Sequence, residues 1–182
     1  MTAERFLSAA CGALAAAWLL AASPACAQAS EQAVKTAFLP KFARYIELAP
    51  AAQPAAGQPY YLCILGRDPF GQQLDRAAAS EVIDGHAVAV RRFADASPAA
   101  VGGCHIAFVA GANDQATVAM LLTLRRQPTL TVTDARIGKA HGMIHFVLAD
   151  GRVRFEIDNA GAAKRGVTIS SRLLALAVQV KQ

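Results

Sequence analysis

The sequence predicts an α/β fold, with a mostly parallel open sheet flanked by helices on both faces, a C-terminal β-hairpin and a terminal helix. Short apolar runs alternate with helical patterns at the spacing that parallel strands and crossover helices require. The run His105–Ala110 is almost continuously apolar, which is typical of a strand covered on both faces. Asp150-Gly151 separates two further apolar runs and indicates a hairpin, because glycine accepts the positive φ of a tight turn.

Residues 1–27 have the pattern of a cleaved secretory signal peptide. A basic residue precedes a long apolar run, and Ala25 and Ala27 form an A-x-A cleavage site. A membrane anchor is one alternative, although the run is short for a span of about 20 residues, and a lipoprotein lipidated at Cys26 is another. We therefore expect a periplasmic protein in which residues 28–182 form a single domain.

The first half of this domain predicts a helix, a linker and then alternating strands and helices. Apolar residues recur at helical spacing over 28–48, and Pro40 inside this segment predicts a kink or a later helix start. The alanine- and proline-rich stretch 49–59 indicates a linker. A second helix is expected over 68–79, with Asp68 as its N-cap and a proline after it. Strands are expected over 60–65, 86–93 and 105–110, and weak helical character over 97–103.

The second half ends in the predicted hairpin. A helix capped by Asn113 or Asp114 is expected to stop before Pro128. A short helix over 159–165 should end at Gly166, which can adopt the left-handed C-cap conformation. Strands are expected over 129–133, 143–148, 153–157 and 167–169.

Charge and composition exclude one class of partner. The formal net charge is +5 at pH 7, but the basic residues are scattered or paired. Because no basic stripe with interleaved aromatic residues occurs, we expect no nucleic-acid binding. A mildly basic surface fits an acidic protein partner or simple solubility.

Cys63 and Cys104 are the cysteines of the predicted mature chain. An even number in an exported chain favours one disulfide. Both lie in apolar runs predicted as strands, and neighbouring strands bring such residues within bridging distance. Two buried free thiols are the alternative.

Three groups of residues resemble binding or catalytic motifs, but a purely structural role explains each of them better. Residues 66–71 join a strand to a helix, as a phosphate cradle does, but their glycine spacing fits neither the dinucleotide fingerprint nor the P-loop. His141 and His145 are four residues apart, which on a helix would place two metal ligands on one face, but a glycine and a strand pattern argue against a helix. In a strand they would also share a face, but nothing ties the other histidines, His86 and His105, to the same site. Ser170 and Ser171 lack a nucleophile elbow, and one of them is expected to cap the last helix. We expect no catalytic residue, metal or cofactor.

Arg44 is open to two interpretations. It stands between Phe42 and Tyr45, close to the apolar face of the first predicted helix. Structurally, it would cover core surface with its stem and keep its guanidinium in water. Functionally, it would clamp a ligand carboxylate or phosphate, or an acidic residue of a partner.

Five segments carry a resemblance to a known family: AFLPKFARYIEL, YLCILG with DPFG, CHIAFVAG, PTLTVTD and GMIHFVLADGRVRFEIDNAGAAKRGVTISSRLLALA. They span nearly the whole mature chain, and in them it resembles the YfiR family of periplasmic regulators. The resemblance implies a non-catalytic α/β domain that often dimerises and acts in cyclic-di-GMP signalling and biofilm control. The founding member represses a membrane-bound diguanylate cyclase through its periplasmic sensor domain and is captured by an outer-membrane lipoprotein.

The resemblance also implies roles for single residues. Cys63 and Cys104 fall where the founding member has one disulfide. Gly138 and His145 stand at roughly the places of its second disulfide, so this chain lacks that bridge.

Candidate binding residues follow from the same resemblance. Arg44 falls where the founding member has an arginine linked to small-ligand binding. A basic residue and a histidine near its last helix are replaced here by Thr168 and Ser170, so the ligand pocket would differ.

Together these observations predict a regulator. It would bind and inhibit the periplasmic part of a membrane diguanylate cyclase or sensor kinase, as a homodimer, with an outer-membrane lipoprotein as a further partner. We expect the contact surface to be apolar at its centre and to come from the first helix and the hairpin edge. A periplasmic small-molecule binding module, with Arg44 holding an anion, is the alternative. An enzyme is least expected, because no acid, base and nucleophile set converges in the sequence.

Overall fold

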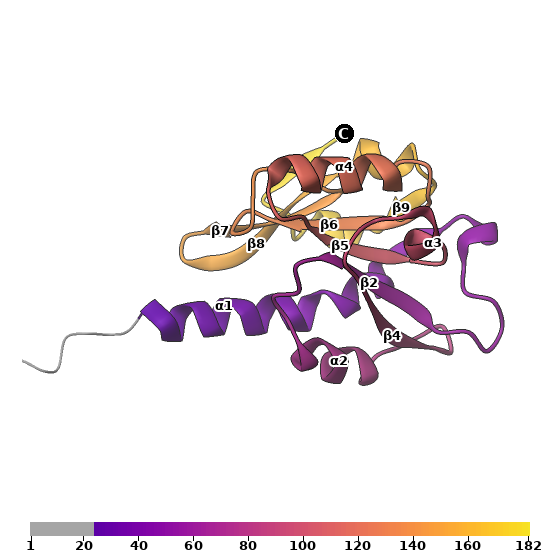
Figure 1. The fold of residues 1–182 in the computed structure, drawn as a ribbon, viewed down its shortest axis with the longest axis horizontal. Helices are drawn as coiled ribbons and strands as arrows, with labels where there is room; N and C mark the ends of the chain where they lie inside the picture. The colour runs from indigo at the N-terminus through magenta and orange to yellow at the C-terminus, as the bar shows by residue number, and fades with distance from the viewer. Residues whose placement is uncertain (1–23) are drawn as a thin grey trace, which may run out of the picture.

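The computed structural model describes residues 24–182 (Figure 1). Residues 1–23 hold most of the predicted signal peptide and lie outside the described residues, so cleavage after Ala27 stays a prediction. Within residues 24–182, no helix has both the length and the apolar character that a membrane crossing requires.

Eight strands form the central sheet, and a further pair lies beside it. The sheet strands are β2 (Tyr60–Gly66), β3 (Val82–Ile83), β4 (His86–Phe93), β5 (Ile106–Ala110), β6 (Leu130–Asp134), β7 (Ile144–Ala149), β8 (Arg152–Asp158) and β10 (Gln179–Lys181). Their spatial order is β10-β8-β7-β6-β5-β2-β4-β3. Strands β4, β2, β5, β6 and β7 are parallel, whereas β8 pairs antiparallel with β7. The predicted mostly parallel sheet with a C-terminal hairpin is confirmed.

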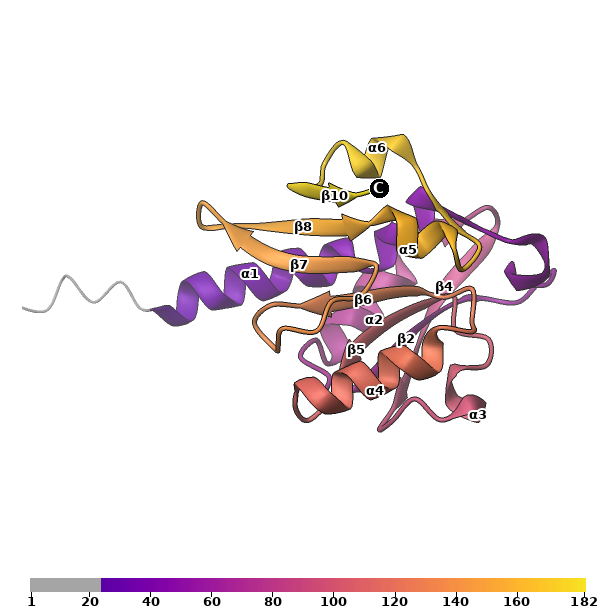
Figure 2. The same cartoon turned by 90° about the horizontal axis from the view of Figure 1, so that it is seen from above.

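Helices cover both faces of this sheet. The helices are α1 (Pro24–Phe38), α2 (Gln72–Ala79), α3 (Pro98–Val101), α4 (Asp114–Leu124), α5 (Asn159–Ala163) and α6 (Ser171–Leu174), with 3₁₀ turns η1 (Pro40–Tyr45) and η2 (Pro50–Ala52). Figures 1 and 2 show α1 and α2 on one face, and α3 and α4 on the other. Phe108 and Val109 of β5 belong to separate cores on these two faces, because successive side chains of a strand point in opposite directions.

One part of the larger core lies between the hairpin and the segment that follows α1. The ring of Phe42 lies 5.7 Å from that of Phe146 and 5.8 Å from that of Phe155, measured between centroids. Leu39 and Leu173 are also fully buried in this core. The hairpin therefore packs directly on the N-terminal part of the chain.

The prediction of one helix over 28–48 is wrong. The chain leaves α1 at Phe38 and forms η1 from Pro40, which has no backbone N–H and whose ring clashes with the preceding turn of a helix. It then becomes strand β1 (Ile46–Leu48), which pairs antiparallel with β9 (Val167–Ile169). The break buries Phe42 and joins this segment to the end of the chain.

The predicted N-cap Asp68 does not cap α2 directly. Its carboxylate accepts the amides of Phe70 at 2.8 Å and Gly71 at 3.1 Å, and α2 begins only at Gln72. This is the side-chain turn that aspartate favours before a helix. Arg92 donates to the other carboxylate oxygen of Asp68 at 2.7 Å, so the segment is a strand-to-helix turn with its polar groups satisfied internally.

The other caps are where the sequence placed them. The side chain of Asn113 accepts the amide of Ala116 at the start of α4, and that of Ser170 accepts the amide of Leu173 at the start of α6. Gly166 has a φ of +72° after α5. Strands β3 and β10 were not expected, since two or three residues at a sheet edge give too short a pattern to recognise.

Candidate functional site

An apolar surface runs from α1 onto the hairpin. Val34 and Phe38 of α1 are 37% and 38% exposed and lie four residues apart, on one side of the helix. Leu148, near the hairpin tip, is 41% exposed, and its neighbour on β8, Val153, is half-buried. We call these four residues the hairpin–helix face.

The packing beneath this face holds its parts together. Phe146 contacts Phe42, so it points to the side of the sheet that carries α1. Leu148 is two residues further along β7 and points to the same side. The ring of Phe38 lies 6.4 Å from that of Phe155, edge to face. In Figures 1 and 2, α1 runs alongside the hairpin towards its tip, so α1 and the hairpin form one surface.

A buried ion network fixes α1 on the sheet. Lys35 is 1% exposed, and its ammonium donates to both carboxylate oxygens of Asp134, at 2.8 and 2.7 Å, and to Glu31 one turn earlier in α1. Arg136 donates to the other oxygen of Glu31 at 2.9 Å. The ring of Phe146 lies 5.9 Å from the Lys35 nitrogen. Two acids and two bases therefore neutralise each other across α1 and the end of β6.

The network also decides the protonation state of its outer acid. Burial alone would raise the pKa of Glu31, but hydrogen bonds from Lys35 and Arg136 outweigh burial, and the pKa lies below its usual value. Glu31 is therefore ionised over the whole neutral range. A buried pair of this kind contributes little net stability but is costly to break, because the remaining charge has no partner.

Asp134 is the acid of this network that lies on the sheet. It is the last residue of β6 and is 4% exposed. Two signals pointed to the network: Glu31 and Lys35 have the i, i+4 spacing of a helical ion pair, and Asp134 directly follows a predicted buried strand. Neither signal shows that the two segments meet.

His141 and His145 are brought together, with their ring centroids 3.8 Å apart. Burial, with the nearby His141, lowers the pKa of His145 to about 4. The Thr133 hydroxyl accepts the amide of Gly142 and lies 2.8 Å from Nδ1 of His145. The carboxylate of Glu156 lies 3.6 Å from Nδ1 of His141. Among residues 24–182, no three His, Cys, Asp or Glu side chains are grouped for metal binding.

Arg44 ends η1 and is held by an acid. Its Nε and Nη2 atoms each lie 2.7 Å from one carboxylate oxygen of Glu81, just beyond α2. The Glu81 side chain is 9% exposed, whereas that of Arg44 is 48% exposed. The arginine thus neutralises a buried acid and still presents about half of its side chain to solvent.

Thr168 and Ser170 lie beside the Arg44 segment. Thr168 is exposed and is opposite Glu47 in the β1–β9 pair. The amide of Ser170 donates to the carbonyl of Tyr45 at 2.9 Å, while its hydroxyl caps α6. The backbones are therefore adjacent, but the Arg44 side chain is directed to Glu81 rather than to these hydroxyls.

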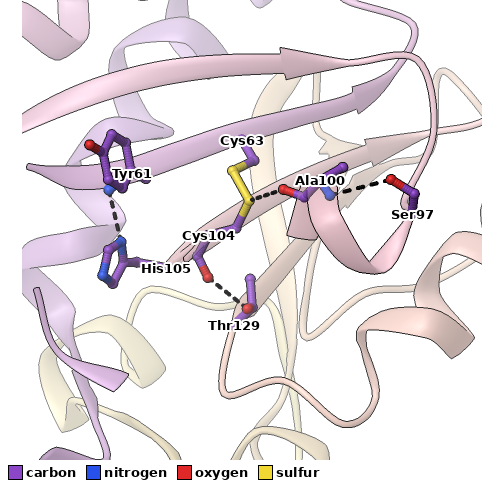
Figure 3. The surroundings of a disulfide bond; sticks show 7 residues. All are labelled: Tyr61, Cys63, Ser97, Ala100, Cys104, His105 and Thr129. Carbon is purple, nitrogen blue, oxygen red and sulfur yellow. Dashed lines mark hydrogen bonds between the residues drawn. A yellow bond between two sulfur atoms is a disulfide. The ribbon is translucent and has the colours of Figure 1, made fainter. Parts of the chain in front are cut away.

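Cys63 and Cys104 form the predicted disulfide (Figure 3). Their Cα atoms are 5.8 Å apart, and the bridge joins the middle of β2 to the residues just before β5. Both side chains are buried in the smaller core, with Leu65 and Leu124. The Cys104 carbonyl accepts the Thr129 hydroxyl at 2.7 Å, so the bridge also fixes the start of β6.

A pocket of about 360 Å³ opens next to this bridge, between the stretch 51–59 and the amino ends of β2, β5 and β6. His105 lines it, and its Nδ1 accepts the amide of Tyr61 at 2.8 Å, as Figure 3 shows. Burial lowers the pKa of His105 below its usual value. The guanidinium of Arg91 lies 3.3 Å from the centre of the Tyr61 ring. No sequence pattern predicted this pocket, because its walls come from four separate segments.

Comparison with known proteins assigns the family. A family model described as YfiR/HmsC-like matches residues 32–178, which include the disulfide, the hairpin, and the Lys35–Asp134 pair of the ion network. No curated protein matches the chain significantly. Because the family model covers most of the chain, the resemblance of the five segments is confirmed, and this chain belongs to the YfiR/HmsC-like family.

Proposed function

We propose that this protein is a non-catalytic periplasmic regulator that binds and inhibits the periplasmic part of a membrane signalling enzyme. A diguanylate cyclase is the first candidate for that enzyme, and a sensor kinase is the second. The observation that carries the proposal is membership of the YfiR/HmsC-like family over residues 32–178. Through this partner the protein would lower cyclic-di-GMP and restrain biofilm formation.

The hairpin–helix face is the surface that best suits such a partner. Val34, Phe38 and Leu148 expose apolar side chains on one side of the molecule, which suits the apolar centre of a protein interface. The ion network beneath keeps α1 in place, so the face is formed before binding and loses little conformational entropy when it binds.

Inhibition requires a difference in affinity. The regulator must bind the inactive state of the receptor more tightly than the active state, since equal affinity for both would shift nothing. A preference of about tenfold, or 1.4 kcal/mol, changes the ratio of the two states tenfold. An outer-membrane lipoprotein that captures the regulator would reverse this shift by removing it from the receptor.

The binding experiment uses affinity capture from membranes, with mass spectrometry to identify the partner. The wild-type protein is compared with Phe38→Glu, which places a charge in the hairpin–helix face, and with Val82→Glu, at a position 55% exposed on β3. We expect a membrane diguanylate cyclase or sensor kinase with wild type and Val82→Glu, and its loss with Phe38→Glu. Absence of such an enzyme from the wild-type capture would refute the proposal.

A small-molecule anion-binding module is the second candidate function. Its support is that about half of the Arg44 side chain stays exposed beside Thr168 and Ser170, although Glu81 holds the guanidinium. Isothermal titration with inorganic phosphate and with a nucleoside monophosphate, on wild type and Arg44→Ala, tests it. Binding that disappears in Arg44→Ala, without any captured membrane enzyme, would favour this function over the first.

A further inference from the structure

The pocket beside the disulfide has no part in the regulatory function proposed above. Its volume of about 360 Å³ lies in the range of small-molecule binding sites. Residues of the stretch 51–59 line it together with residues 103–105 and 127–129 at the edge of the sheet. Neither Arg44 nor a residue of the hairpin–helix face is part of its lining, so the pocket is separate from both.

The sheet side of this pocket is rigid. The disulfide ties Cys104 to Cys63 in β2, and the carbonyl of Cys104 accepts the Thr129 hydroxyl at 2.7 Å. The backbone amide of His105 donates to the carbonyl of Tyr61 at 3.0 Å. A site that is formed before binding loses little conformational entropy when a ligand enters it.

One hydrogen-bond donor is fixed in the pocket. His105 is 7% exposed, and its Nδ1 accepts the amide of Tyr61 at 2.8 Å (Figure 3). Burial holds the pKa of His105 below its usual value, so the ring is neutral. A neutral imidazole whose Nδ1 accepts carries its proton on Nε2. This Nε2 has no hydrogen-bond partner among the residues whose side chains the structure describes, so it can donate to a ligand.

A hydrogen-bond acceptor comes from the stretch 51–59. The amide nitrogen of Gln53 donates to the carbonyl of Leu48 at 3.2 Å. Only this end of the side-chain amide can face a carbonyl oxygen, which fixes the orientation of the group. The side-chain oxygen of Gln53 takes part in no hydrogen bond within the described part of the chain, and it can therefore accept from a ligand.

The remaining lining is uncharged and largely apolar. No Asp, Glu, Lys or Arg side chain lines the pocket within residues 24–182, and Gln58 and Gln127 contribute two further neutral amides. Proline rings and alanine methyl groups form most of the walls: Ala51, Ala52, Pro54, Ala55, Pro59 and Pro128. A charged ligand would lose its water here without gaining a counter-charge in the lining, so the pocket favours an uncharged one.

A donor, an acceptor and apolar walls together suit an amide. Its carbonyl would accept the proton of His105 Nε2, and its N–H would donate to the side-chain oxygen of Gln53. A cyclic amide offers both groups on one compact ring without the charged ends of a free peptide, and apolar substituents on the ring can contact the proline walls. We propose that this pocket binds a small uncharged cyclic amide of the cyclic-dipeptide type. The proposal does not depend on the regulatory function.

The first test is isothermal titration of the mature protein with the cyclic dipeptide of phenylalanine and proline. We expect a dissociation constant of about 0.1 mM, which is ordinary for a ligand of this size. The linear dipeptide of the same two residues is the matched control, because it differs mainly in its charged ends. It should bind at least about tenfold more weakly. No binding of the cyclic dipeptide up to about 5 mM, or equal or tighter binding of the linear one, would overturn the proposal.

The second test locates the ligand with two variants. His105→Asn keeps an acceptor for the Tyr61 amide, because the asparagine oxygen takes the place of Nδ1, but it removes the donor at Nε2. We expect it to weaken binding at least about tenfold. Gln53→Leu, at an exposed position, should weaken binding about threefold or more. Gln115→Leu, an equivalent change on exposed α4 outside the pocket, should leave the affinity unchanged.

Two further measurements keep this test decisive. Circular dichroism shows whether each variant is folded, and Gln53→Leu decides the outcome if His105→Asn does not fold. In nuclear magnetic resonance spectra of the wild-type protein, the cyclic dipeptide should shift the amide signals of Tyr61 and Gly103. Unchanged affinity in folded His105→Asn, unchanged affinity in Gln53→Leu, or shifts confined to other parts of the chain would contradict binding in this pocket.

Discussion

The ammonium of Lys35 donates to both carboxylate oxygens of Asp134, 99 positions later in the chain. This contact joins the first helix to the carboxyl end of β6, and both side chains are almost fully buried. It keeps α1, and with it Val34 and Phe38, in a fixed position on the hairpin. The partner surface that we propose thus depends on a charge pair that lies beneath it.

Breaking this pair should destabilise the fold. We expect Lys35→Met to lower the free energy of unfolding by about 3–5 kcal/mol, because Asp134 is left buried without its counter-charge. Urea denaturation followed by circular dichroism measures the loss. Adding Asp134→Leu should recover part of the stability, since two apolar side chains replace the pair. A loss below about 1 kcal/mol for Lys35→Met, as is typical of exposed pairs, would contradict this role.

We expect the free energy of unfolding to fall at acidic pH, because His145 is buried in its neutral form. Its pKa is lowered to about 4 in the fold, whereas an unfolded chain protonates near 6.5. The unfolded state thus binds the extra proton first, so this stability is present above about pH 6.5 and is lost as the pH falls towards 4.

The difference between the folded and unfolded pKa values of His145 corresponds to about 3 kcal/mol of stability. This conversion applies because the side chain is only 3% exposed. Urea midpoints at pH 7.5, about pH 5.5 and about pH 4.5 measure it. We expect His145→Gln to flatten the profile and His86→Gln, at the start of β4, to leave it steep. Identical slopes for wild type and His145→Gln would show that other groups cause the decline.

Removal of the disulfide should have a large effect. The bridge closes a loop with a sequence separation of 41 residues, for which the chain-entropy model gives about 4 kcal/mol. We expect the double variant Cys63→Ala with Cys104→Ala to lose roughly this amount in thermal or urea unfolding. Thiol titration of denatured, unreduced protein checks the bridge itself: two reactive thiols in the exported protein would mean that it does not form.

Gly66 should tolerate no side chain. It has a φ of +87°, and a Cβ there would overlap the carbonyl oxygen of Ala110 on the neighbouring strand. We expect Gly66→Ala to lower the unfolding free energy by more than about 2 kcal/mol. Gly151 has a φ of +68° with open space around it, so Gly151→Ala should cost about 1 kcal/mol. Equal losses in the two variants would mean that backbone strain, and not the close approach to Ala110, causes the destabilisation.

Local patterns were enough for most of the sheet. Apolar runs, alternation and turn residues located β2, β4, β5 and the hairpin, because each of these strands has its own apolar pattern and a turn signal beside it. Pro40 predicted a break, but the periodicity of 28–48 hid the strand β1. That strand forms only because β9 lies beside it, which is long-range information that no local pattern contains.

The candidate site was harder to predict than the fold. Arg44 could be selected by its neighbours, but its partner Glu81 lies in a distant segment. The Lys35–Asp134 pair and the pocket beside the disulfide likewise depend on how segments meet in space. Cys63 and Cys104 were the exception, because an exported chain with two cysteines offers a single intramolecular pairing.

Inhibition of the membrane enzyme is the central proposal, and the most direct test is the rate of cyclic-di-GMP synthesis in membranes from a strain that lacks this protein. We predict that added wild-type protein lowers the rate saturably, that Val82→Glu acts like wild type, and that Phe38→Glu has lost the effect. A rate that stays unchanged at saturating wild-type protein would contradict the regulatory function.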